Sequence, residues 1–200
     1  MNKVEALANL KKQMMSCSKC SLWIETPKIV FGEGNPDADI IFVGESSGEN
    51  ESKTGRPFCG KAGILLTKIL KSINLTRDNI FITNIIHCRP PNNRDPKDDE
   101  VSACIDYLKE QIHIIQPKVI VLLGAVALKS LFQDPKLGIG KNRGIWHNYE
   151  NVPVMPTYHP AFLLRQMSEK NKNNVKSDLN LVINKCREIG SKNKENKNGI

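Results

Sequence analysis

The sequence lacks an apolar run long enough to cross a membrane. Its longest apolar stretch, residues 119–126, is far shorter than the roughly 20 residues that a spanning helix requires. Residues 1–16 mix charged and apolar side chains and contain no continuous apolar segment of the signal-peptide kind. These absences exclude a spanning helix, and we expect a cytoplasmic protein that does not contact a membrane.

The chain also lacks internal repeats and any Gly- or Pro-rich linker. Its 200 residues, 40% of them hydrophobic, are enough for one ordinary core. We expect a single domain over residues 1–190, a disordered basic tail over residues 191–200, and a monomer. Whether the tail contacts a sliding clamp is left open.

The net charge of +8 permits binding to nucleic acid but does not establish it. Residues 169–200 contain eight Lys and Arg against four Asp and Glu, so half of the excess charge lies there. An Asn- and Lys-rich solvated tail explains that segment equally well.

Short apolar runs alternate with amphipathic stretches along the chain. Strands are predicted at residues 40–43, 80–86, 119–123, 146–149 and 152–155, and helices at 62–73, 96–115 and 125–132. The alternation is typical of an α/β sandwich with a largely parallel sheet. Unusual segments at residues 44–63, 83–94 and 157–165 follow strands. Because ligands bind beyond the carboxyl ends of such strands, we expect a composite active site there.

Four of the six cysteines form a candidate thiolate site: Cys17, Cys20, Cys88 and Cys104. The first two are a Cys-x2-Cys pair, and the other two follow a strand and lie inside the next helix. Spacing alone does not distinguish zinc from an iron–sulfur cluster, nor either from unligated thiols. Cys59 and Cys186 lack partners at ligand spacing, so we interpret them as buried or free thiols.

Four segments carry a specific family pattern. They are Gly44-Glu-Ser-Ser-Gly48, Gly55-Arg-Pro-Phe-Cys-Gly60-Lys-Ala-Gly63, Thr83-Asn-Ile-Ile-His-Cys-Arg-Pro-Pro-Asn-Asn-Arg-Asp-Pro96 and Tyr158-His-Pro-Ala-Phe-Leu-Leu-Arg165. With the four cysteines, they resemble the iron–sulfur uracil-DNA glycosylases, also called family 4, over about residues 10–185. The resemblance implies a three-layer α/β/α sandwich with a mainly parallel four-stranded sheet. It also implies an enzyme of base excision repair that hydrolyses the N-glycosidic bond of uracil in DNA and leaves an abasic site.

The resemblance assigns a 4Fe–4S cluster to the four cysteines and base recognition to the first three motifs. Asn84 matches the residue that reads uracil, since an amide can donate to O4 and accept from N3–H. Phe58 matches the aromatic ring that stacks on the flipped base, and Gly44 belongs to the same substrate-binding set. Without the family, an Asn after a strand is more often a turn or cap residue, and a Phe beside Pro57 is more often part of the core.

Two residues match the catalytic positions of the family. His159 is aimed at uracil O2, where negative charge accumulates, and Glu45 orients water or stabilises the sugar cation. The sequence departs from the family at Ser46-Ser47, where Ala-Pro is usual, and loss of the proline loosens that loop. Glu49 and Glu51 are neighbouring carboxylates that could be confused with Glu45, and a solvated acidic loop is the alternative interpretation of all three.

The last motif supplies candidate DNA contacts. Phe162, Leu163 and Leu164 either fill the gap left by the flipped base or begin a helix that faces the core. Candidate phosphate contacts are Arg165, Arg89, Arg94 and Lys61.

Three other functions stay open at this point. Ser46-Ser47 motivates a same-fold glycosylase with broadened specificity for hypoxanthine or xanthine. A non-catalytic nucleic-acid-binding relative and a zinc-binding structural protein are the alternatives from other classes.

Overall fold

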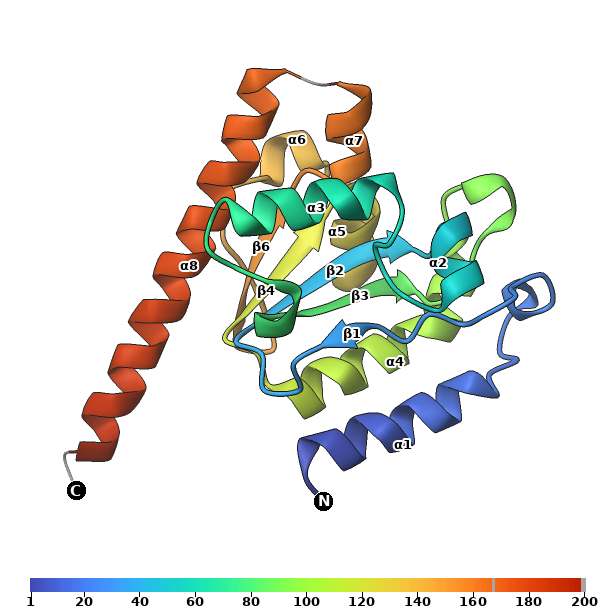
Figure 1. Cartoon of the computed structure of the whole chain (residues 1–200), viewed down its shortest axis with the longest axis horizontal. Coiled ribbons are helices and arrows are strands. Elements are labelled where there is room, and N and C mark those ends of the chain that lie inside the picture. The colour runs from blue at the N-terminus through green and yellow to red at the C-terminus, as the bar shows by residue number, and fades with distance from the viewer. Residues whose placement is uncertain (167, 199–200) are drawn as a thin grey trace.

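A six-stranded sheet lies at the centre of the structure, a computed structural model that describes residues 1–166 and 168–198 (Figure 1). The sheet order is β1-β3-β2-β4-β6-β5. The strands are β1 (Glu33–Gly34), β2 (Ile40–Ser46), β3 (Phe81–Ile86), β4 (Val119–Leu123), β5 (His147–Tyr149) and β6 (Val152–Thr157). β3, β2, β4 and β6 pair in parallel, whereas β1 and β5 pair antiparallel at the two edges.

The resemblance implied a sheet of four strands, and this count is therefore wrong. The inner four strands are parallel as expected. Both edge strands are short. β5 and β6 lie at the strands predicted over residues 146–149 and 152–155 and form a hairpin with its turn at Glu150-Asn151, whereas the two residues of β1 are too few to produce a pattern. The inner strands are apolar because both of their faces are covered: every residue of β4 is buried.

Helices occupy most of the remaining chain. They are α1 (Lys3–Met15), α2 (Glu49–Thr54), α3 (Lys61–Lys71), α4 (Asp98–Ile115), α5 (Ala125–Phe132), α6 (Ile139–Asn142), α7 (Pro160–Arg165) and α8 (Glu169–Asn198), with short 3-10 helices η1 (Ser21–Trp23), η2 (Arg77–Asn79) and η3 (Pro91–Asn93). The predictions for α3, α4 and α5 are confirmed to within two residues at each end.

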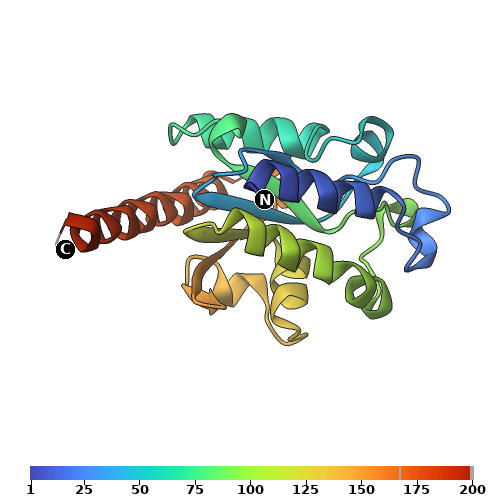
Figure 2. The ribbon, with the colours of Figure 1, turned by 90° about the horizontal axis from the view of Figure 1, so that it is seen from below.

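The sheet separates two hydrophobic cores, and this division makes the three layers. Because successive side chains of a strand point to opposite faces, Ile41 and Val43 join one core and Ile40 and Phe42 join the other. The first core is closed by α1, α4 and α5, and the second by α3, α7 and α8. Figure 2 shows α3 and α4 on opposite sides of the sheet.

The last helix, α8, packs on β4 and β6 with its first half and projects away from the sheet with its second (Figures 1 and 2). Residues 191–198 continue this helix where the sequence suggested a disordered tail, and residues 199–200 lie outside the described residues. Over the part of the chain that is described, no helix combines the length and apolarity needed to cross a membrane.

Candidate active site

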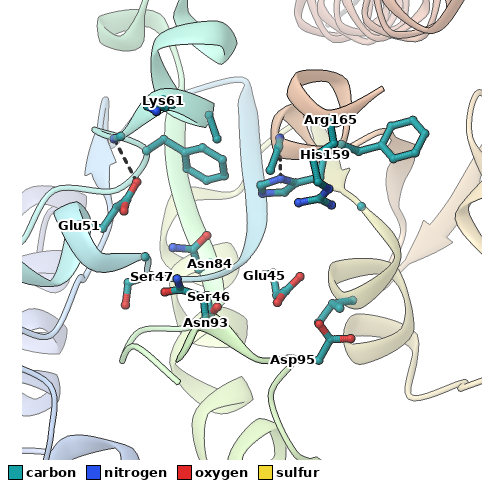
Figure 3. Close-up of a pocket in the computed structure, with 18 of the residues that line it drawn as sticks. Glu45, Ser46, Ser47, Glu51, Lys61, Asn84, Asn93, Asp95, His159 and Arg165 are labelled. Carbon is teal, nitrogen blue, oxygen red and sulfur yellow. Dashed lines mark hydrogen bonds between the residues drawn. The ribbon is translucent and has the colours of Figure 1, made fainter. Parts of the chain in front are cut away.

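A cavity of about 580 Å³ lies beyond the carboxyl ends of the parallel strands (Figure 3). All three segments that the sequence singled out reach it, and so do the ends of β2, β3, β4 and β6. Four residues with predicted roles line it together: Glu45, Phe58, Asn84 and His159. The sheet thus gathers side chains that are more than 100 residues apart in sequence.

Asn84 lies in β3 directly beside Gly44 of β2, its parallel partner. The Asn84 side chain is 1% exposed, and its Oδ1 atom accepts no hydrogen bond from any residue that the structure describes. Gly44 is required for this approach, because a Cβ there would lie 2.3 Å from Asn84 Oδ1 and 2.6 Å from the Phe58 ring. A buried polar atom without a partner is costly, so Oδ1 is available to accept a hydrogen bond.

Phe58 holds its ring over the same corner of the cavity in an unusual backbone conformation. Its φ is 51°, in the left-handed region that residues with side chains rarely adopt. Its carbonyl group packs closely against Gly63 of α3, because a Cβ on Gly63 would lie 1.6 Å from the Phe58 oxygen. The ring is buried, and its centroid lies 5.6 Å from that of the His159 ring. The two rings form one wall of the cavity.

His159 is the N-cap residue of α7, and this position fixes its tautomer. The main-chain N–H of Ala161 donates to His159 Nδ1 at 3.1 Å, so in the neutral ring the proton lies on Nε2. Burial and, to a lesser extent, the positive charge of Arg165 lower the pKa of His159 to about 4. At neutral pH the cavity therefore contains an uncharged imidazole with one N–H free to donate.

Glu45 follows the apolar part of β2 and is partly buried in the same cavity (Figure 3). Its pKa is raised to about 7: burial makes the largest contribution, the negative charge of Asp95 adds to it, and the positive charge of Arg165 opposes both. The carboxyl group is therefore about half ionised at neutral pH, and small changes in neighbouring charge shift its state. Asp95 was not assigned a role from the sequence, where it is one of several polar residues near the end of the motif over residues 83–96.

The two carboxylates that the sequence could not separate from Glu45 have other partners. Glu49 pairs with Lys53 at 2.6 Å and with Arg89 at 3.7 Å. Glu51 accepts a hydrogen bond from the Gly60 N–H at 3.2 Å, which ties α2 to the loop before α3. Glu45 makes no hydrogen bond or ion pair within the described residues, so it is the carboxylate left available to a ligand.

The candidate DNA contacts divide between surface and core. Leu163 is part of α7, is 1% exposed, and packs in the core on the buried side of this helix. The prediction that it contacts DNA is therefore wrong. The alternative interpretation, a helix facing the core, holds for this residue. Leu164 is 39% exposed, Arg165 is exposed, and Phe162 packs partly buried against Tyr158 with ring centroids 4.7 Å apart.

The candidate phosphate contacts also differ in availability. Lys61 lines the cavity at the start of α3. Arg94 is committed to the buried Glu100 through bonds of 2.8 and 2.6 Å. Arg89 donates to Asn93 at 2.9 Å. Lys61 and Arg165 are thus the basic residues best placed beside the cavity.

The four cysteines of the candidate thiolate site line a second, small cavity of about 20 Å³ between the loop after α1, the end of β3 and α4. The other lining residues are mostly apolar, and all four thiols are free. Burial raises the pKa of Cys88 to about 11 and that of Cys104 to about 12. No group of three or more Cys, His, Asp or Glu in the described residues is arranged around a single metal ion. Cys59 and Cys186 lie elsewhere.

The chain belongs to the uracil DNA glycosylase superfamily, whose sequence model matches residues 31–182. A type-4 uracil-DNA glycosylase of Sulfurisphaera tokodaii is 50% identical over 80% of this chain and 77% of its own length. The type-4 uracil-DNA glycosylase of Thermotoga maritima is 43% identical over 88% of this chain and 92% of its own length. The type-4 uracil-DNA glycosylase of Saccharolobus solfataricus is 44% identical over 84% of this chain and 83% of its own length. Within the superfamily, these similarities place the chain in the type-4 group.

The state of His159 can be measured directly. Nuclear magnetic resonance of the imidazole nitrogens should show a neutral ring with its proton on Nε2 at pH 7, titrating near pH 4. A His159→Gln variant identifies the signal, and the exposed His113 is an internal reference. Titration of His159 near the ordinary value of 6.5 would contradict the site geometry.

Proposed function

We propose that the protein removes uracil from DNA by hydrolysing the N-glycosidic bond, with an extruded uracil bound in the 580 Å³ cavity. The observation that carries the proposal is the buried Asn84 amide, whose Oδ1 atom lacks a partner beside the Phe58 ring and the bare face of Gly44. An amide can accept from uracil N3–H and donate to O4, whereas cytosine presents the reverse pattern. The names of the type-4 relatives support the same activity in base excision repair.

Bond cleavage leaves negative charge on the uracil and positive character on the sugar. His159 supplies a fixed Nε2–H donor for the anionic O2 without carrying a charge of its own. Glu45, in its ionised form, orients the attacking water or stabilises the sugar cation. Both groups are positioned by strand ends and a helix start, so little reorganisation is needed during the reaction.

The DNA strand is held by groups at the rim of the cavity. Arg165 and Lys61 are placed to contact phosphates. The exposed Leu164, together with the edge of Phe162, takes the role of filling the gap in the duplex. Leu163 supports them from the core beneath.

We also propose that Cys17, Cys20, Cys88 and Cys104 hold a 4Fe–4S cluster. Four free thiols that share one largely apolar cavity are a suitable donor set. In such a cluster each thiolate binds a different iron atom, so the sulfurs need not converge on one ion. With all four positions filled by cysteines of this chain, such a cluster would stabilise the structure and would have no open position for a reaction.

The Ser46-Ser47 departure does not favour broadened specificity. Ser47 is buried, and its hydroxyl donates to the His87 carbonyl at 3.3 Å, which anchors the loop although the proline is missing. Ser46 pairs with Ile86 in the sheet register. The loop is therefore fixed by hydrogen bonds at the position where members of the family usually have a proline ring.

The proposed function is tested by cleavage of an oligonucleotide that contains uracil. Asn84→Asp should lower kcat/KM by about 100-fold, because the donor to O4 is lost and a charge is buried. His159→Ala should cost about 2–4 kcal/mol of transition-state stabilisation. Asn148→Asp and His113→Ala, which change exposed residues of the same types, should cleave at the wild-type rate. Full activity in both site variants would contradict the assignment.

Glu45 should make the reaction depend on pH. Its pKa in the folded protein is about 7, and the ionised form is the working one, so kcat/KM should fall as the pH drops through 7. Asp95→Asn removes a charge that raises this pKa, so the acid limb should move to lower pH. Asp106→Asn, on the exposed side of α4, should leave the limb in place. A profile that is flat between pH 6 and 8 would exclude this role.

The cluster can be detected without measuring activity. Protein purified without oxygen should be brown, with broad visible absorption and about four iron atoms per chain. Cys88→Ser should lose most of the iron and absorption, whereas Cys186→Ser should retain both. A colourless protein that contains one zinc ion would show that the site is a zinc site.

A further inference from the structure

We propose that Arg77, which does not line the cavity, is a positioning residue that fixes the base-stacking ring of Phe58 through the main chain. This inference rests on the proposed function, because it assigns Phe58 to the bound uracil. It adds a residue outside the four motifs, at the start of η2.

The guanidinium group of Arg77 binds two consecutive carbonyl groups of the loop before α3. Nη1 donates to the Phe58 oxygen at 3.1 Å, and Nη2 donates to the Pro57 oxygen at 2.5 Å. The planar fork of arginine can reach both acceptors at once. The arginine thus sets the orientation of the peptide groups on which the Phe58 side chain depends.

Glu33 of the edge strand β1 holds Arg77 in this place. Arg77 Nε donates to Glu33 Oε1 at 2.9 Å, and the other carboxylate oxygen accepts from Arg56 Nε at 2.9 Å. The side chains of Arg77 and Glu33 are only 20% and 25% exposed, so water screens their pairing less than at an open surface. Burial raises the pKa of Glu33, but the two arginines outweigh it and keep the carboxylate ionised.

Phe58 requires such support because its conformation is not one that it would adopt freely. A φ of 51° is rarely populated by an aromatic residue and persists only where neighbouring groups determine it. Gly63 confines the Phe58 carbonyl from the side of α3, and the backbone at Gly44 confines the ring from the sheet. Arg77 supplies the remaining constraint, on the carbonyl oxygens themselves.

The chain offers a matched control for this arginine. Arg56 binds the same Glu33 carboxylate but is 65% exposed and makes no hydrogen bond to Phe58 within the described residues. Arg56→Met and Arg77→Met each remove one arginine from Glu33. Only the second removes the bonds to the carbonyl groups.

The experiment measures cleavage of a uracil-containing oligonucleotide, inhibition by free uracil and thermal unfolding for both variants. Arg77→Met should lower kcat/KM by about 10- to 100-fold and weaken inhibition by free uracil by a similar factor. Arg56→Met should change neither by more than about twofold. The same pair is then made in a Phe58→Ala background, where Arg77→Met should have no further effect, because its target ring is absent.

If Arg77→Met does not fold, Arg77→Lys replaces it, since lysine keeps the charge beside Glu33 but lacks the planar fork. Equal activity and equal uracil inhibition in the Arg77 and Arg56 variants would overturn this inference alone. So would an undiminished effect of the Arg77 variant in the Phe58→Ala background. Wild-type protein that leaves uracil in DNA would overturn the proposed function and, with it, this inference.

Discussion

The close approach of β2 and β3 at their carboxyl ends is the constraint on which the site depends. The backbone of Gly44 runs so near the Asn84 amide and the Phe58 ring that no side chain fits between them. This contact brings a hydrogen-bonding edge and an aromatic face to one point of the cavity. Catalytic groups from β2 and α7 are then added around a recognition corner that the sheet itself makes rigid.

The sequence predicted the inner layers of the fold well, because buried parallel strands and amphipathic helices have clear periodicities. It did not predict the edge strand β1, whose two residues are held by pairing with β3 and not by any pattern of their own. The projecting half of α8 is Lys- and Asn-rich, and such a composition resembles a disordered tail as much as a solvated helix. The cavity residues that were assigned a role from the sequence, such as Asn84 and His159, were recognised because they belong to a motif.

Contacts between segments that lie far apart in the chain leave no local sequence pattern, so the sequence did not predict them. Leu163 and Leu164 are identical neighbours in sequence, and only the direction of α7 places one in the core and the other at the surface. The Glu33–Arg77 pair acts on Phe58 from outside the motifs, and Asp95, although it lies within one motif, acts on Glu45 of another. Their side-chain types are common in loops, so no local signal distinguishes them from solvated charges.

Burial, Asp95 and Arg165 together set the charge state of the cavity. Burial disfavours charge of either sign, so it lowers the pKa of His159 and raises that of Glu45. The positive charge of Arg165 lowers both pKa values, so it adds to the effect of burial at His159, whereas at Glu45 it opposes burial and Asp95 and favours the carboxylate. This combination suits a reaction that develops a cation at the sugar and an anion at the base, because the negative group and the neutral donor are in place before either charge appears.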